Sequence, residues 1–235
     1  MLFKKGRSNS RIWGYLGGSV LAAAALLVSV PVAASLCAST TSCTIALTQG
    51  NGGSGFGTGN FGTVDLELSG NTVTITVSLA AGFQIVNTGF PGSFGFADSL
   101  GGGLTIGGFS SILYSGAASH ATNDLHFDGF GYVNNAAATT GPHAGSGLQS
   151  VSFTVSKGSS ITDVNQLLNL ANPAGGDGAA VFIVDAYNSN RTGPGAGNTG
   201  LLTGTTTVVT DAPEPATLAL LCIGFAGFGF WRRKR

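Results

Sequence analysis

Strict alternation of apolar and polar residues in two neighbouring runs, 64–68 and 72–79, is the feature that most restricts the fold of this chain. One side of segment 72–79 carries Ser or Thr, and the other carries Val73, Ile75, Val77 and Leu79. An extended strand sends successive side chains to opposite faces, so this pattern is typical of a half-buried strand. Residues 64–68 alternate in the same way, and Ser69-Gly70-Asn71 joins the two runs. The segment therefore predicts an antiparallel β-hairpin.

Further short apolar runs continue the β pattern. Residues 151–155 alternate, so we expect Phe153 to share one core with the apolar side of 72–79. Residues 179–184 are apolar on both faces and predict a covered, central strand. Weaker strand candidates are 44–47, 83–86, 104–106 and 125–127. Because glycine-rich turns such as 49–62 and 101–103 separate these runs, the sequence predicts a mainly β fold, an antiparallel β-sandwich.

One short helix is expected within the sandwich. Residues 160–163 have a capping-box pattern, and Asn172-Pro173 would end the helix. The apolar residues between these signals recur at helical spacing: Ile161, Val164, Leu167, Leu168 and Ala171.

The N-terminus has the organisation of an export signal. Lys4, Lys5, Arg7 and Arg11 precede the uncharged segment 12–30, and Val32-Ala33-Ala34 offers small side chains for cleavage before Ser35. We therefore predict a signal peptide over 1–34, removed by signal peptidase. The alternative is an N-terminal anchor that is never cut.

The C-terminus combines a helix-breaking segment, an apolar run and a basic end. Pro213-Glu214-Pro215 prevents a helix from beginning earlier, and residues 216–231 carry no charge. A helix of this length spans roughly 24 Å, somewhat less than the hydrocarbon core of a bilayer. The chain then ends in Arg232-Arg233-Lys234-Arg235, which the positive-inside rule keeps in the cytoplasm. We predict a transmembrane helix over 216–231.

This tail resembles the PEP-CTERM sorting signal, which marks substrates of the membrane protease-transpeptidase exosortase. The resemblance implies transient anchoring in the inner membrane, cleavage by exosortase and a final location at the cell surface or outside the cell. It also implies an association with exopolysaccharide or biofilm. The alternative is a plain membrane anchor. Residues 82–89 and 94–96 resemble, more loosely, β-rich domains found ahead of such tails.

These signals divide the chain into a signal peptide (1–34), an exported β-sandwich domain (35–192), a Gly/Thr-rich linker (193–212) and the sorting signal (213–235). Residues 35–211 contain only two basic residues against nine acidic ones, a net charge of −7. Because nucleic-acid binding needs a basic surface, this balance excludes a nucleic-acid partner.

The two cysteines near the mature N-terminus predict a disulfide. Cys37 and Cys43 enter an oxidising compartment if the chain is exported, and close cysteines usually pair there. The alternative is two free thiols.

Polar clusters offer only weak candidates for a metal or catalytic site. His120, Asp124, His126, Asp128 and His143 could bind zinc, but their spacing matches no known ligand pattern. Oxygen donors for calcium flank the strand at 179–184, without EF-hand spacing: Asp177, Asp185, Asn188 and Asn190. Such residues more often form turns. The glycines of 57–62 match GxGxxG, but a turn precedes them and a strand follows, against a dinucleotide site.

We therefore expect no cofactor, no metal and no catalytic residues. The preferred interpretation is a non-enzymatic exported surface or extracellular-matrix protein. The alternative is a secreted carbohydrate-binding module or hydrolase on a β-sandwich. That alternative needs aromatic platforms, and residues 35–212 contain Tyr114, Tyr132 and Tyr187 but no Trp.

Overall fold

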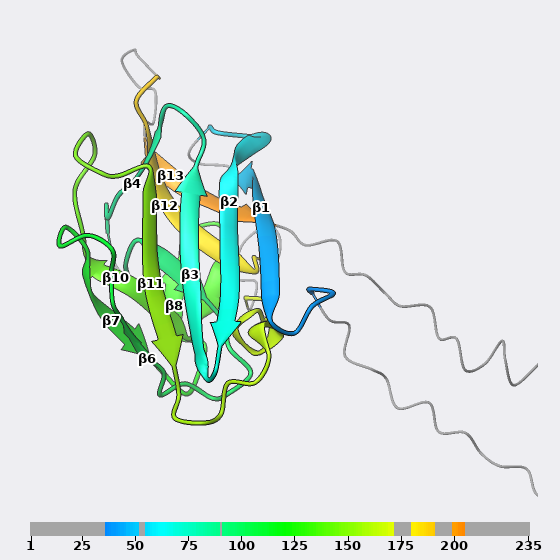
Figure 1. The fold of residues 1–235 in the computed structure, drawn as a ribbon. Helices are drawn as coiled ribbons and strands as arrows, with labels where there is room; N and C mark the ends of the chain where they lie inside the picture. The colour runs from blue at the N-terminus through cyan, green and yellow to red at the C-terminus, as the bar shows by residue number, and fades with distance from the viewer. Residues whose placement is uncertain (1–35, 52–54, 90, 172–179, 191–198, 205–235) are drawn as a thin grey trace, which may run out of the picture. The chain divides into compact units, whose positions relative to one another are not determined.

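The computed structural model of the chain describes residues 36–51, 55–89, 91–171, 180–190 and 199–204 (Figure 1). The predicted signal peptide and sorting signal lie outside these residues. The strands are β1 (Ser42–Gly50), β2 (Thr58–Ser69), β3 (Thr72–Leu79), β4 (Phe83–Ile85), β5 (Phe94–Phe96), β6 (Thr105–Gly107), β7 (Ser115–Ser119), β8 (Leu125–Phe127), β9 (Gly131–Val133), β10 (Asn135–Thr140), β11 (Ser150–Ser156), β12 (Phe182–Asn188) and β13 (Thr199–Gly204). A 3₁₀ helix, η1, covers Val164–Leu167. The mainly β prediction is confirmed.

One long antiparallel sheet forms both layers of the sandwich. Its strand order is β6-β11-β3-β2-β1-β13-β12-β5-β10-β7, with β4 also paired to β12. Figure 1 shows β11, β3, β2 and β1 in front and β13, β12 and β10 behind. The sheet passes between the layers at β1, whose register shifts between Leu47 and Gln49, after which Gln49 and Gly50 pair with β13. Such a bulge bends a strand, so β1 belongs to both layers.

The predicted hairpin forms the centre of the front layer. Strands β2 and β3 pair from Ser69↔Thr72 to Gly62↔Leu79, and Gly70 adopts the left-handed φ of +60° that the tight turn requires. Strand β11 pairs with β3 along its whole length. The side chains predicted to share one core are buried in the same cluster: Val73, Ile75, Val77 and Phe153.

Phenylalanine rings connect the two layers. Phe153 of β11 stacks on Phe94 of β5, with ring centroids 5.2 Å apart. Phe96 of β5 stacks on Phe182 of β12 at 5.7 Å. These rings fill the space between the sheets with large apolar surface, which supplies most of the stabilisation of such a core.

The back layer is covered on both faces, as the apolar run 179–184 predicts. Val184 faces the main core, whereas Ile183 belongs to a second cluster with Phe127 and Val133. Strands β8 and β9 form a separate two-stranded sheet that contributes the last two of these residues. The outer face of β12 is therefore buried beneath this hairpin.

Three local predictions need correction. Segment 160–171 forms only η1, which begins after a capping box of Asp163 and Gln166 rather than at the predicted box of 160–163. The helix ends early, because the backbone N–H of Asn169 donates to the carbonyl of Ala97 instead of continuing the helix. The apolar residues of that segment are buried all the same. Residues 199–204, assigned to the linker, form β13 between β1 and β12. Residues 58–62, assigned to a turn, begin β2.

Candidate functional site

A cavity of about 200 Å³ lies at the end of the back layer where several loops meet. Its lining comes from segments distant in sequence and includes Asn51, Thr88, Gly92, Phe127, Asp128 and Asp185. Asn51 holds two of these segments together. Its Oδ1 accepts from the backbone N–H of Leu201, and its Nδ2 lies 3.5 Å from the carbonyl oxygen of Asp128.

Asp185 is the buried acidic residue of this cavity. Alternation along β12 places Asp185 on the same face as Ile183, away from the main core. Only 3% of the residue is exposed. Its Oδ2 accepts hydrogen bonds from the backbone N–H and the hydroxyl of Thr88, each at 2.7 Å. Its Oδ1 is also buried and accepts no hydrogen bond from any residue that the structure describes.

Burial raises the pKa of the Asp185 carboxyl to about 6, although the hydrogen bonds from Thr88 and the nearby backbone N–H of Ala186 favour the charged form. The other oxygen donors considered for calcium are not brought to it within the described residues. Asp177 lies outside the described residues, and the Asn188 side chain accepts from the Asn190 backbone N–H in a turn. A buried carboxyl with a raised pKa in a cavity is a recognised sign of a functional site.

A second buried carboxylate, Asp98, is satisfied by its neighbours. Its Oδ2 accepts from the side-chain amides of Asn134 (2.8 Å) and Asn135 (2.7 Å). Its Oδ1 accepts from the backbone N–H of Leu100 and of Gly102. With both oxygens occupied, Asp98 has a structural role in fixing the loop after β5.

The histidine and aspartate candidates form two separate exposed pairs. His120 Nδ1 lies 2.7 Å from Asp124 Oδ1, and His126 Nδ1 lies 3.4 Å from Asp128 Oδ1. His143 is exposed in a turn that Ser146 closes. Within the described ranges, no three His, Cys, Asp or Glu side chains come close enough to hold a metal ion. The structure therefore does not assemble these five residues into one site.

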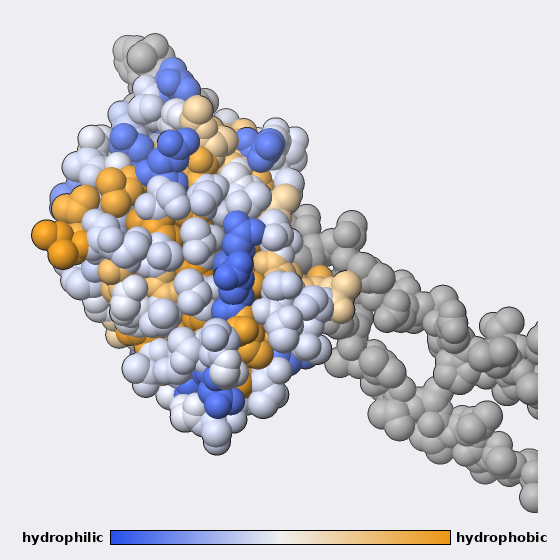
Figure 2. All heavy atoms as spheres, viewed as in Figure 1, coloured by the Kyte–Doolittle hydropathy of each residue, from blue (hydrophilic) through white to orange (hydrophobic). Residues whose placement is uncertain are grey.

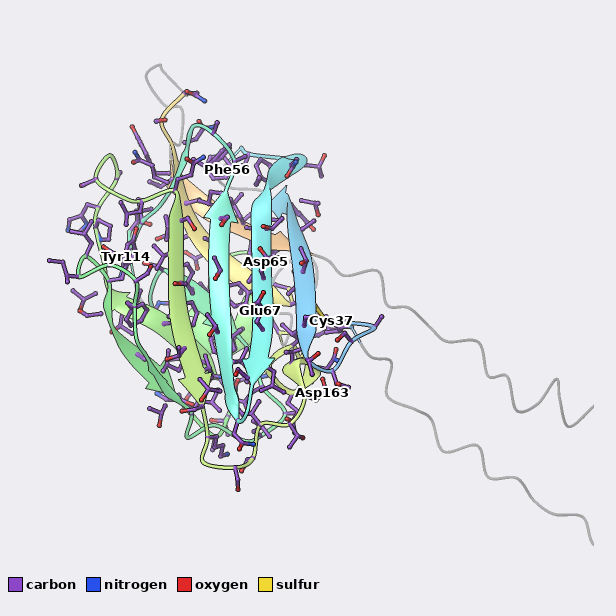
Figure 3. All side chains as sticks on the ribbon, in the orientation of Figure 1. Cys37, Phe56, Asp65, Glu67, Tyr114 and Asp163 are labelled. Carbon is purple, nitrogen blue, oxygen red and sulfur yellow. A yellow bond between two sulfur atoms is a disulfide. The ribbon has the colours of Figure 1, made fainter. Side chains whose placement is uncertain are left out.

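The outer face of the front layer carries an ordered array of hydroxyl groups. Residues with short polar side chains face each other across β3 and β11 in the pairs Ser150↔Ser78, Ser152↔Thr76, Thr154↔Thr74 and Ser156↔Thr72. On β2, Asp65 accepts hydrogen bonds from the hydroxyls of Thr44 (2.6 Å) and Thr63 (3.2 Å). Figure 2 shows this face as pale, with a hydrophilic stripe over β2 where Figure 3 labels Asp65 and Glu67.

The predicted disulfide is confirmed. Cys37 and Cys43 are joined, with their Cα atoms 5.6 Å apart. The closed loop ends on the second residue of β1, Cys43, and the backbone N–H of Cys37 donates to the side chain of Asn165 in η1. The disulfide therefore fixes the entry of the chain into the sandwich.

Comparison with protein families matches residues 211–234 to the PEP-CTERM protein-sorting motif. The chain carries a PEP-CTERM sorting motif. This PEP-CTERM chain is accordingly an exported protein that its tail holds transiently in the membrane and that an exosortase processes. The matched segment contains most of the predicted sorting residues: Pro213, Glu214, Pro215, Arg232, Arg233 and Lys234.

The PEP-CTERM tail, with Arg235 at its end, lies outside the described residues. Within the ranges described, the protein has no helix long and apolar enough to cross a membrane. Comparisons with curated proteins and with solved structures gave no match.

Proposed function

We propose that the exported domain is a non-enzymatic matrix protein, released by cleavage near Pro215 and retained by exopolysaccharide at the cell surface. The sorting motif at 211–234 carries this proposal, because it directs the domain to the cell exterior. The domain that arrives there has a disulfide, a closed apolar core and few charges. A domain with a packed core and a low density of charged side chains, mostly acidic, suits a hydrated polymer network.

The hydroxyl array of β3 and β11 supports a polysaccharide partner. Each Ser or Thr hydroxyl can both donate and accept, as the hydroxyls of a sugar do. Thr154 already donates to the carbonyl of Gly107, and the hydroxyls of Ser78 and Ser150 bond each other. The paired rows keep these groups at the regular spacing of adjacent strands, about 4.8 Å. Since each contact replaces hydrogen bonds to water, its net gain is small, about 1 kcal/mol. Retention would therefore come from many weak contacts along a polymer.

Burial of Tyr114 weakens the alternative of a carbohydrate-binding module that stacks sugars on aromatic rings. Its hydroxyl donates to the carbonyl of Ile85 and accepts from the N–H of Leu148, so the ring is part of the core. Tyr132 is partly exposed but packs against the ring of His126, with centroids 4.7 Å apart. One of the three predicted tyrosine platforms is therefore not available.

Processing can be tested by mass spectrometry of the surface form. The mature protein should lack residues 225–235. Replacing Pro213, Glu214 and Pro215 by Ala should leave the uncut chain in the membrane fraction, whereas Thr217→Ala, in the same tail, should be processed normally. A surface form that keeps 225–235 would show that the tail is only an anchor.

Retention can be tested by co-sedimentation with exopolysaccharide purified from the producing cells. A variant with Thr74→Ala, Thr76→Ala, Ser152→Ala and Thr154→Ala should bind several-fold less. A control with exposed hydroxyls elsewhere, Thr122→Ala and Ser159→Ala, should bind as the wild type does. Equal binding by both variants would refute the role of this face. A hydrolytic activity abolished by single changes at Asp124, His126, Asp128 or His143 would overturn the non-enzymatic proposal.

A further inference from the structure

The cavity beside β12 has the properties of an ion site. We propose that it binds a divalent cation of calcium size, with Asp185 as the buried ligand and Asp128 as the second carboxylate. This inference concerns the back layer and is independent of the proposed role of the front face.

The geometry of Asp185 leaves one oxygen for a ligand. Both hydrogen bonds from Thr88 go to Oδ2 and fix the orientation of the carboxyl group. The backbone groups of Asp185 are also used, since its N–H donates to Ser93 and its carbonyl accepts from Val86. Oδ1 remains buried and accepts no well-formed hydrogen bond from any described residue, although the backbone N–H of Ala186 lies near enough to favour the charged carboxylate. A buried acceptor left in this state is costly, and a bound cation would remove that cost.

The charge around Asp185 also favours a cation. Asp128 lines the same cavity, and His126 is its neighbour at 3.4 Å. Lys157, the lysine of the described domain, donates instead to the carbonyls of Leu100 and Gly102. No basic side chain among the described residues forms an ion pair with Asp185. Asp185 and Asp128 thus line one cavity, with little compensating positive charge among the described residues.

The size and donor chemistry select the kind of ligand. Pockets for small organic ligands usually have volumes of about 300–1,000 Å³, and this cavity has about 200 Å³. It suits an ion with some of its waters better than a sugar ring. The two carboxylates and the Thr88 hydroxyl offer hard oxygen donors. Calcium takes six to eight oxygens in variable geometry, including waters, whereas magnesium demands a near-ideal octahedron. A site built from loops that converge from several strands fits calcium, which accepts the more variable coordination geometry.

The test uses the full-length chain in detergent, freed of metal by chelation and dialysis. Isothermal titration with CaCl₂ should show saturable binding, and CaCl₂ should raise the unfolding temperature more than MgCl₂ or choline chloride at equal ionic strength. Asp185→Asn should abolish both effects. Asp128→Asn should weaken the affinity at least about tenfold, the loss expected when a group that supports a metal is removed.

The matched control is Asp65→Asn, which removes an equal charge from the front layer and should leave calcium binding unchanged. If Asp185→Asn fails to fold, Asp128→Asn decides the question, because the Asp128 side chain is 89% exposed. Absence of saturable binding to the wild type at 10 mM CaCl₂ would overturn the proposal. An equal loss of calcium affinity in the Asp65→Asn and Asp128→Asn variants would also overturn the proposal, since binding would then follow the net charge of the protein alone.

Discussion

In the metal-free protein, we compare the free energy of unfolding of Asp185→Asn with that of the wild type. The variant minus wild-type difference should be larger at neutral pH than at acid pH. Burial raises the pKa of Asp185 from 3.8 to about 6 in the folded state. Between these values the unfolded chain has released the proton that the folded chain still holds. Stability therefore falls as pH rises through this window, since the unfolded state binds fewer protons. The amide of the variant does not titrate, so the variant does not lose stability as pH rises through this window.

The magnitude follows from the size of the pKa difference. A gap of about two pKa units, at about 1.4 kcal/mol for each, corresponds to about 3 kcal/mol. The loss is absent below pH 3.8 and complete above pH 6. Asn has nearly the same shape as Asp, and its Oδ1 can accept the hydrogen bonds from Thr88. Any fixed cost of burying the amide is independent of pH and cancels when two pH values are compared.

Urea unfolding of both proteins from pH 3.5 to 7.5, after removal of metal, measures this effect directly. The free energy of unfolding of Asp185→Asn minus that of the wild type should rise by about 3 kcal/mol across the window. Thr88→Val removes a hydrogen bond that lowers the pKa, so it should move the falling limb to higher pH. A difference that stays flat from pH 4 to 7 would refute the raised pKa of Asp185.

Three further predictions concern the fold. Replacing Cys37 and Cys43 by Ser should lower the free energy of unfolding by about 2 kcal/mol, because the disulfide closes a short loop; chemical denaturation measures this, and no change would show that the loop is already ordered without the bond. Phe153→Ala should lower the free energy of unfolding by about 3–5 kcal/mol, since it leaves a cavity between the layers. A decrease below about 1 kcal/mol would contradict the stacked core. Gly62→Ala should lower the free energy of unfolding by about 1–3 kcal/mol, because the φ of Gly62 is +137° and a Cβ would collide with the carbonyl of Ser78. An unchanged melting temperature would contradict this backbone geometry.

The sequence predicted the strands whose own residues carry a clear apolar–polar alternation or turn signal. The hairpin over 64–79 was accessible because period-two alternation and a turn with glycine specify it together. Strands β7 and β10 gave no such signal, because their residues are mostly Ala, Ser, Thr and Gly and are extended only through their pairing with each other and with β5. Strand β13 follows a glycine-rich segment that resembles a linker, and its place between β1 and β12 arises from tertiary contacts.

The same limit applies to the sites. The sorting motif could be recognised because its proline segment, apolar run and basic end are consecutive in sequence. Asp185 could be proposed as an oxygen donor, but its environment could not be predicted. Its hydrogen-bond partner Thr88 is 97 residues away, and Asn51 and Asp128 reach the cavity from other loops. The His120 to His143 segment looked richer in sequence, yet its members form separate pairs on the surface.

The position of β13 links folding to the order in which the chain leaves the cytoplasm. Strand β1 is exported early, but its junction with β12 is completed only when residues 199–204 insert between them. The sandwich therefore cannot close until almost the entire domain has been translocated. Only six residues separate Gly204 from the sorting motif at 211, a reach of at most about 21 Å. The domain thus completes its sheet while a short segment still joins it to the tail that holds it transiently in the membrane.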